Sequence, residues 1–219
     1  GIYDILWTAT DPCGNSASCT QRVTVLNQSC TDATDFDGNI YEGILIGSQC
    51  WLRSNLKSLH YADGRPIPET RGYYADLYPD TVWNISTFGR LYNWYAAVDS
   101  ARPPGRAANI QGICPDGWSM PTVEDFRILM EYGAPALKSA DYWLKNPGNN
   151  STGFTALPAG YYNEVTNSFY YLMGNTYFWT TEAVSAQSAY YFELSYDCEE
   201  LLEKSGSKNQ GYSIRCIKK

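Results

Sequence analysis

The chain has 219 residues, of which 44% are hydrophobic and 18% charged, and its net charge is −7. This length and composition exclude a disordered chain and fit either one good-sized domain or one domain together with a fragment of another. The acidic balance and the lack of a basic stripe exclude a typical nucleic-acid partner, and no apolar run reaches the ~18 residues of a membrane span.

Seven cysteines are spread along the chain without a CxxC pair, and His60 is the single histidine. A zinc site needs four grouped ligands, and no such group is visible in this spacing. We therefore predict no metal and no cofactor. Disulfides formed in an oxidising, extracellular compartment are the expected use of these cysteines.

Residues 1–28 read as a unit apart from the rest. IYDILWTATD and CTQRVTVLN alternate around a Gly-Asn loop, which predicts a β-hairpin with Val23 and Val25 on one face. Cys13 and Cys19 flank the loop closely enough to cross-link. The stretch WTATDPCGNSASCTQRVTV resembles the end of a hyalin-repeat domain, an extracellular immunoglobulin-like sandwich. We expect the earlier strands of that domain to precede Gly1.

Residues 29–38 are polar and are expected to link this hairpin to the next unit. NIYEGILIGSQCWLRSNL predicts two strands that turn at Gly47–Ser48. In STFGRLYNWYAAV the apolar residues recur at helical spacing, which predicts a short helix through residues 86–98. The residues that define this spacing are Leu91, Trp94, Tyr95 and Val98.

MPTVEDFRILMEYG carries the clearest helix signal in the chain. Thr122 is the expected N-cap, and Asp125 stands at the capping-box position. Phe126, Leu129 and Met130 are predicted to form the buried stripe, and Gly133 to end the helix. Downstream, TYFWTTE, AYYFELSY and GYSIRCIKK predict strands separated by turns. The order predicts an α+β domain with a mostly antiparallel sheet and two helices.

Six motifs follow one another along the chain: DFDGNIYEGILIGSQCWLRSNL, GRLYNWYAA, GICPDGWSMPTVEDF, GFTALPAGYY, FWTTE and GYSIRCIKK. Together they resemble the Fibrobacter succinogenes major paralogous domain of secreted Bacteroidetes proteins. The resemblance covers about residues 30–219 and implies a C-type lectin-like fold, and we expect the domain to span residues 29–219. It does not imply sugar binding, because function belongs to sites and not to folds.

The resemblance also implies a disulfide. In C-type lectin-like domains a cysteine near the helices pairs with one on the last strand, which here are Cys114 and Cys216. Cys30 and Cys50 flank the first strands and are the next expected pair. Cys198 is then left over, as a free thiol or as a partner in an intermolecular bond.

Catalytic groups are hard to find in this sequence. A nucleophilic Cys114 would need a base, and His60 is 54 positions away without a marked partner. Glu182 in FWTTE is expected to anchor a turn by hydrogen bonds. Asp35, Asp37 and Asn39 hint at calcium, but an Asp-Gly turn explains them more simply, and the calcium motifs of classical lectins are absent. We therefore expect a protein that is not an enzyme.

A surface rich in tyrosine remains as the candidate for function. Nine of the 19 tyrosines fall between Tyr161 and Tyr212, and several occur as adjacent pairs. Because neighbours on a strand point to opposite faces, one of each pair is expected in the core and the other outside. The acidic stretch 193–204 follows them. We predict a ligand-binding face composed of Tyr171, Tyr177, Tyr191, Glu193, Tyr196, Asp197 and Glu199.

The functional expectation is a non-catalytic, extracellular binding or adhesion module on a bacterial surface, with a glycan or a protein as ligand. One alternative is a phage receptor-binding protein, because some members of the resembled family have this face randomised by diversity-generating retroelements. A second alternative is a secreted hydrolase that uses a carboxylate pair.

Overall fold

The computed structural model describes residues 2–24, 30–68, 72–73, 81–101 and 109–219. These residues are mostly β, and the strands in chain order are β1 Ile2–Thr10, β2 Ser16–Thr24, β3 Ala33–Thr34, β4 Ile40–Tyr41, β5 Gly43–Ile46, β6 Gln49–Leu52, β7 Gly72–Tyr73, β8 Leu91–Tyr92, β9 Ala159–Asn163, β10 Ser168–Leu172, β11 Asn175–Ala183, β12 Ser188–Ser195, β13 Leu202–Ser207 and β14 Ile217–Lys218. The described helices are few and short: α1 Thr81–Phe88, α2 Trp94–Ala97, α3 Val123–Met130 and α4 Ala134–Leu137. The expected mixture of strands and two helices is therefore mostly β among the described residues, with four short helices instead of two.

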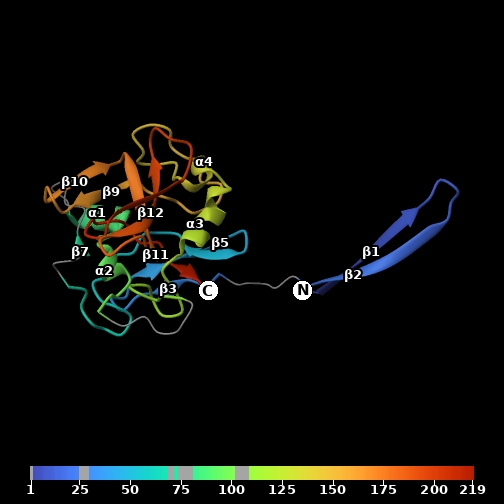
Figure 1. Cartoon of the computed structure of the whole chain (residues 1–219), viewed down its shortest axis with the longest axis horizontal. Coiled ribbons are helices and arrows are strands. Elements are labelled where there is room, and N and C mark those ends of the chain that lie inside the picture. Colours follow the sequence, from blue (N-terminus) through green and yellow to red (C-terminus); the bar gives the residue numbers. More distant parts are fainter. Residues whose placement is uncertain (1, 25–29, 69–71, 74–80, 102–108) are drawn as a thin grey trace.

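The expected N-terminal hairpin is confirmed, because β1 and β2 pair in antiparallel register and stand apart from the rest of the chain (Figure 1). The Asp11 carboxylate closes the loop by accepting the backbone N–H groups of Cys13 and Asn15, each at 2.9 Å. The predicted Cys13–Cys19 disulfide is wrong, since both cysteines are free. Cys13 lies in this loop, whereas Cys19 lies within the ladder opposite Trp7. The predicted domain boundary at residues 28–29, like Val25, falls outside the described residues.

A five-stranded sheet in the order β10-β9-β11-β12-β13 forms the centre of the remaining chain. Its pairs are antiparallel except for β9 with β11, which run parallel, so the sheet is mixed. One face packs on α3, where the Phe126 ring stacks on those of Phe178 and Phe192 with centroids 5.8 and 4.8 Å apart. Because side chains alternate along a strand, Tyr177 and Tyr191 lie on the opposite face.

The capping box of α3 is confirmed: Thr122 accepts the Asp125 N–H, and the Asp125 carboxylate accepts the Thr122 N–H at 2.7 Å. Glu182 of β11 accepts the Val123 N–H at 3.0 Å. Glu182 therefore anchors the start of this helix rather than a turn. Met130 was wrongly placed in the buried stripe and is 38% exposed. It follows buried Leu129 by one residue, which rotates it about 100° around the helix.

The helix predicted through residues 86–98 is broken. Gly89 has a positive φ of 79°, and α1 ends just before it. A Cβ on Gly89 would lie 2.7 Å from the Asn55 Cβ. The chain then forms the short strand β8, and Asn93 caps α2 by accepting the Ala96 N–H at 2.9 Å. Close packing at Gly89 thus overrides the helical spacing of the apolar residues.

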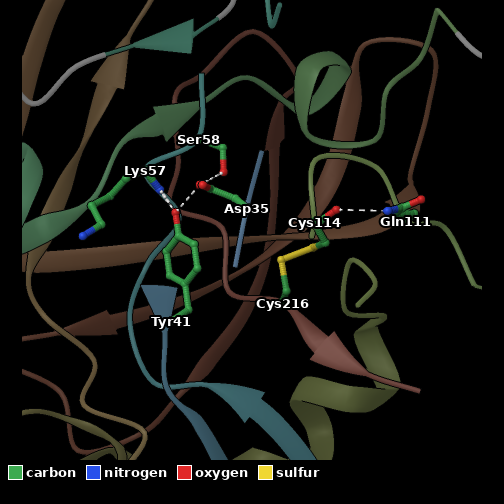
Figure 2. Close-up of a disulfide and its surroundings, with 7 residues drawn as sticks. All are labelled: Asp35, Tyr41, Lys57, Ser58, Gln111, Cys114 and Cys216. Carbon is green, nitrogen blue, oxygen red and sulfur yellow. Dashed lines mark hydrogen bonds between the residues drawn. A yellow bond between two sulfur atoms is a disulfide. The ribbon is translucent and has the colours of Figure 1, made fainter. Parts of the chain in front are cut away.

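The C-terminal segment connects the sheets rather than forming one long strand. Tyr212 pairs with Tyr92, Ser213 bridges to Phe178, and Ile217 pairs with Trp51 of β6. The predicted β5–β6 hairpin with its Gly47–Ser48 turn is confirmed. Figure 2 shows the Cys114–Cys216 disulfide, which joins residues 102 positions apart. This disulfide and the Cys30–Cys50 disulfide are confirmed.

The Asp-Gly turn favoured over calcium is also confirmed. Asp35 starts the turn, where its carbonyl accepts the Gly38 N–H at 3.1 Å. Its carboxylate accepts hydrogen bonds from Ser58 Oγ at 2.6 Å and from the Tyr41 hydroxyl at 2.8 Å (Figure 2). Asp35 therefore ties the turn to the chain that follows β6.

Candidate functional site

A cavity of about 370 Å³ opens on the face of the five-stranded sheet opposite α3. Each strand of that sheet contributes to it, and the segment after β13 completes it. The lining residues are Tyr161, Tyr171, Asn175, Tyr177, Tyr191, Glu193, Lys204, Gly206, Ser207, Gln210 and Tyr212, which we call the tyrosine cavity. Its size falls at the lower end of the ~300–1,000 Å³ range of small-molecule sites.

The strand register explains why these side chains meet. Tyr177 of β11 stands directly opposite Glu193 of β12, and Tyr191 stands opposite Lys204 of β13. Asn175 precedes Tyr177 by two positions and so points to the same face. The alternation that buries Phe178 and Phe192 under α3 therefore also turns the cavity residues outward.

The tyrosine rings of the wall differ in how deeply they are buried. Tyr212 is buried and stacks on Tyr177 with centroids 5.0 Å apart, and it also contacts Tyr191 at 4.8 Å. Tyr161 meets Tyr177 edge-on at 5.2 Å. Tyr171 is 56% exposed and forms the rim. The inner rings are thus fixed by one another, whereas the outer rings present free surface.

Three polar side chains of the wall, Asn175, Glu193 and Lys204, are joined by hydrogen bonds. Glu193 Oε1 accepts the Asn175 amide at 2.7 Å, and its Oε2 accepts Lys204 Nζ at 2.6 Å. The Glu193 side chain is only 9% exposed, against 44% for that of Lys204. The hydrogen bond with Glu193 raises the pKa of Lys204. The pair is therefore a fixed, neutral unit at neutral pH.

The phenols of Tyr177 and Tyr191 remain protonated. Burial raises the pKa of Tyr177 far above its ordinary value, and the negative charge of Glu193 adds to the effect. Burial followed by the same charge also raises the pKa of Tyr191. These hydroxyls can therefore serve as neutral hydrogen-bond donors and acceptors across the physiological range.

One acceptor in the wall has no partner. Gln210 Oε1 is buried and receives no hydrogen bond. Burying an amide oxygen without a donor costs about 1–3 kcal/mol. An unsatisfied buried atom in a residue that lines a cavity calls for an explanation, and a donor from a bound molecule is one such explanation.

Tyr171 has an unusual backbone conformation. Its φ is +59°, a left-handed value that is uncommon for a bulky residue. The residue opposite it in the strand pair, Gly160, has a φ of +67°, and a Cβ there would lie 2.3 Å from the Tyr170 carbonyl oxygen. Strained backbone of this kind costs about 1–3 kcal/mol and is concentrated at functional sites.

The structure brings together four of the seven residues predicted for the binding face: Tyr171, Tyr177, Tyr191 and Glu193. The other three lie in the turn after β12, outside the cavity lining. The Asp197 carboxylate contacts Ser195 Oγ, the Tyr196 N–H bonds to the Gly174 carbonyl at 2.9 Å, and the Glu199 carbonyl accepts the Ala134 N–H at 3.1 Å. The first contact is local to the turn, and the other two tie the turn to Gly174 and to the start of α4.

Sequence reasoning missed six polar or aromatic members of the wall. They are Tyr161, Asn175, Lys204, Ser207, Gln210 and Tyr212. The period-two pattern would have selected Asn175 once Tyr177 was chosen. The stretch 193–204 was read as one acidic segment, whereas it spans the end of β12, a turn and the start of β13, which pair Glu193 with Lys204.

His60 has a partner that the sequence did not mark. Its Nδ1 lies 2.5 Å from Asp37 Oδ1, and Asp37 Oδ2 accepts the N–H of Leu59 at 2.6 Å. Burial acts to raise the pKa of Asp37, but the hydrogen bonds from His60 and the backbone outweigh it and lower that pKa. The pair joins the Asp-Gly turn to the chain after β6.

A second hollow of about 270 Å³ is bordered by acidic groups and one arginine. Arg65 pairs there with Asp63 at 2.8 Å and with Asp99. Within the part of the chain that the structure describes, no group of three or more His, Cys, Asp or Glu side chains could hold a metal ion. No helix among these residues is long and apolar enough to cross a membrane.

Comparisons with known proteins identify the family. Searches of curated proteins and of solved structures each returned no match to this chain. The family model described as the Fibrobacter succinogenes major domain matches residues 44–218. That match includes the five-stranded sheet, both disulfide partners Cys114 and Cys216, and every residue of the tyrosine cavity. The chain belongs to the Fibrobacter succinogenes major domain family.

Proposed function

We propose that this protein is a non-catalytic, extracellular ligand-binding or adhesion module and that the tyrosine cavity is its binding site. The ligand is a glycan or a protein on a cell surface. The observation that carries the proposal is the strained Tyr171 at the rim of a cavity walled by aromatic rings, because folding alone does not favour this backbone conformation.

Surface chemistry supports the same proposal. Tyrosines give a large contact area at low cost in side-chain entropy, and they are enriched at binding hot spots. The Glu193–Lys204 pair adds directional polar contacts. Two disulfides fit an oxidising compartment, which supports an extracellular location. For residues 29–219 we propose the C-type lectin-like fold, supported by a long-range disulfide that ties the segment before α3 to the C-terminal segment.

The test is a binding screen of the labelled full chain against arrays of glycans and of extracellular proteins. Replacing Tyr171, Tyr191 or Lys204 singly by alanine should weaken any array hit by about 1–3 kcal/mol, as hot-spot residues do. Tyr132→Ala is the matched control, because Tyr132 is 41% exposed, follows α3 on the other side of the sheet and does not line the cavity.

A second set of variants tests the predicted residues outside the cavity. Tyr196→Ala, Asp197→Ala and Glu199→Ala should leave binding unchanged if the cavity alone carries it. If a ligand still binds all three cavity variants but binds none of these three turn variants, the binding site lies in the turn after β12.

A further inference from the structure

We propose that the tyrosine cavity holds a single uncharged sugar ring, the terminal pyranose of a glycan. This inference rests on the proposed function, since it names the ligand class for the same cavity. Three properties of the wall lead to it: its charge, its exposed ring faces and its unused hydrogen-bonding atoms.

The charge of the wall favours a neutral ligand. Glu193 and Lys204 are its only charged residues, and their 2.6 Å contact leaves no net charge. A carboxylate or phosphate ligand would approach the buried Glu193 without a free cation to offset it. A quaternary ammonium ligand would be attracted by the aromatic rings but would meet the ammonium of Lys204. A neutral ligand avoids both costs.

The exposed rings favour a ligand with a flat, weakly polar face. Aromatic faces carry negative charge density and attract the slightly positive C–H groups of a ring that lies over them. Tyr171 at the rim and the half-buried Tyr161 and Tyr191 provide such surfaces. A pyranose combines a C–H face with hydroxyl groups around its edge, whereas an aliphatic amino-acid side chain offers only the former.

The unused polar atoms favour a ligand that both donates and accepts hydrogen bonds. Gln210 Oε1 needs a donor. Lys204 uses one of three N–H groups on Glu193, and each Glu193 oxygen can accept more than the single bond that it receives. Neighbouring hydroxyls of a sugar supply both donors and acceptors. An apolar peptide side chain would leave Gln210 unsatisfied.

The size of the cavity limits the ligand to about one ring. A volume of about 370 Å³ lies near the minimum of the ~300–1,000 Å³ range of small-molecule sites. The exposed Tyr171 marks the open side, where the remainder of a glycan can leave the cavity. We therefore infer recognition of a chain end rather than of a chain interior.

The experiment titrates the full chain with methyl glycosides of neutral hexoses, 6-deoxyhexoses and pentoses, with methyl uronosides and with tetramethylammonium chloride. Binding is followed by calorimetry and by Trp fluorescence, since the Trp179 ring lies 4.3 Å from that of Tyr212. We expect at least one neutral glycoside to bind saturably. Gln210→Leu, Tyr191→Ala and Glu193→Gln should each weaken it at least tenfold, and Tyr132→Ala, at an exposed tyrosine outside the cavity, should not. Circular dichroism confirms that each variant is folded.

Different failures separate this inference from the proposed function. Variant-sensitive binding of uronosides or tetramethylammonium, but of no neutral glycoside, would overturn the neutral-sugar class while the cavity remains a ligand site. Another outcome is that no glycoside binds, while an array protein binds wild type but not the cavity variants. In that case the ligand class is again wrong and the proposed function stands. A glycoside that binds wild type and all variants equally would place its site elsewhere and overturn the inference.

Discussion

Tyr170 and Tyr171 are neighbours in β10, yet both of their rings stack on that of Tyr161, with centroids 5.6 and 6.1 Å away. In a regular strand one of them would point to the other face. The positive φ of Tyr171, matched by that of Gly160 across the strand pair, accounts for the departure. β10 thus departs from regular strand geometry at Tyr171, and this departure places the Tyr171 ring beside that of Tyr161 at the cavity.

This conformation predicts an inverted preference for glycine. Tyr171→Gly should be more stable than Tyr171→Ala by about 1 kcal/mol, because a Cβ in the left-handed region costs about 1–2 kcal/mol. At Tyr170, where φ is not positive, alanine should be the more stable by about 0.5–1 kcal/mol. Urea unfolding of the four variants, followed by Trp fluorescence, measures both differences. Equal stability of the two Tyr171 variants would contradict the strain argument.

The same pair shows how far the sequence predicts the site. Strand alternation correctly separates Tyr161 from Tyr162, since the first ring joins the cavity and the second packs against Phe169. It also separates Tyr190 from Tyr191, which pack against different core clusters. It fails for Tyr170 and Tyr171, because a positive φ at a tyrosine leaves no sign in a hydrophobic pattern.

Long-range contacts explain the other differences. The six motifs were sufficient to predict the family and the Cys114–Cys216 disulfide. The capping box of α3 was readable because all of its groups lie within four residues. Lys204 and Gln210 were missed because their roles arise from the register of β12 with β13 and from the path of the segment after β13. The helix predicted through residues 86–98 is broken, despite the helical spacing of its apolar residues, because Gly89 packs tightly on Asn55.

The two disulfides should differ in their contribution to stability. Cys114–Cys216 closes a loop of 102 residues and Cys30–Cys50 one of 20. Chain-entropy reasoning predicts a loss of about 4–5 kcal/mol for the first and about 3 kcal/mol for the second when both partners are replaced by alanine. Urea unfolding of the two double variants tests this order. Cys13→Ser with Cys19→Ser is the control and should change little, since both thiols are already free.

The Asp37–His60 pair predicts an acid-sensitive contribution to stability. The pKa of Asp37 is lowered in the folded protein, so this contribution is present above the ordinary carboxyl value of about 4 and is lost as pH falls through the folded value. Asp37→Asn should therefore destabilise the protein at pH 6, and its difference from wild type should shrink below pH 4. Thermal melts between pH 3 and pH 7 give the profile. The stability of Asp63→Asn serves as a comparison at another turn. A stability difference between Asp37→Asn and wild type that does not change with pH would exclude the charge-based explanation.

Arg215 is a charged residue of the C-terminal segment that is fully buried. Its guanidinium is not exposed and donates to Asn55 Oδ1 at 2.7 Å, to the Arg53 carbonyl at 2.8 Å and to the Leu52 carbonyl at 3.2 Å. Burial lowers its pKa to about 9, so the group remains charged at pH 7. The charge is held by oxygen dipoles and by the Phe154 ring, 4.4 Å from the guanidinium carbon.

Arg215→Lys should destabilise the protein by about 3 kcal/mol or more, because an ammonium keeps the buried charge and leaves most of these acceptors unpaired. Arg215→Met should cost no more than Arg215→Lys, since it removes the charge together with the donors. The control is Arg127→Lys, whose exposed pairing with Glu203 predicts a much smaller change. Urea unfolding at pH 7 measures all three. An Arg215→Lys protein as stable as wild type would show that the planar fork of donors is dispensable and that charge alone holds the segment against β6.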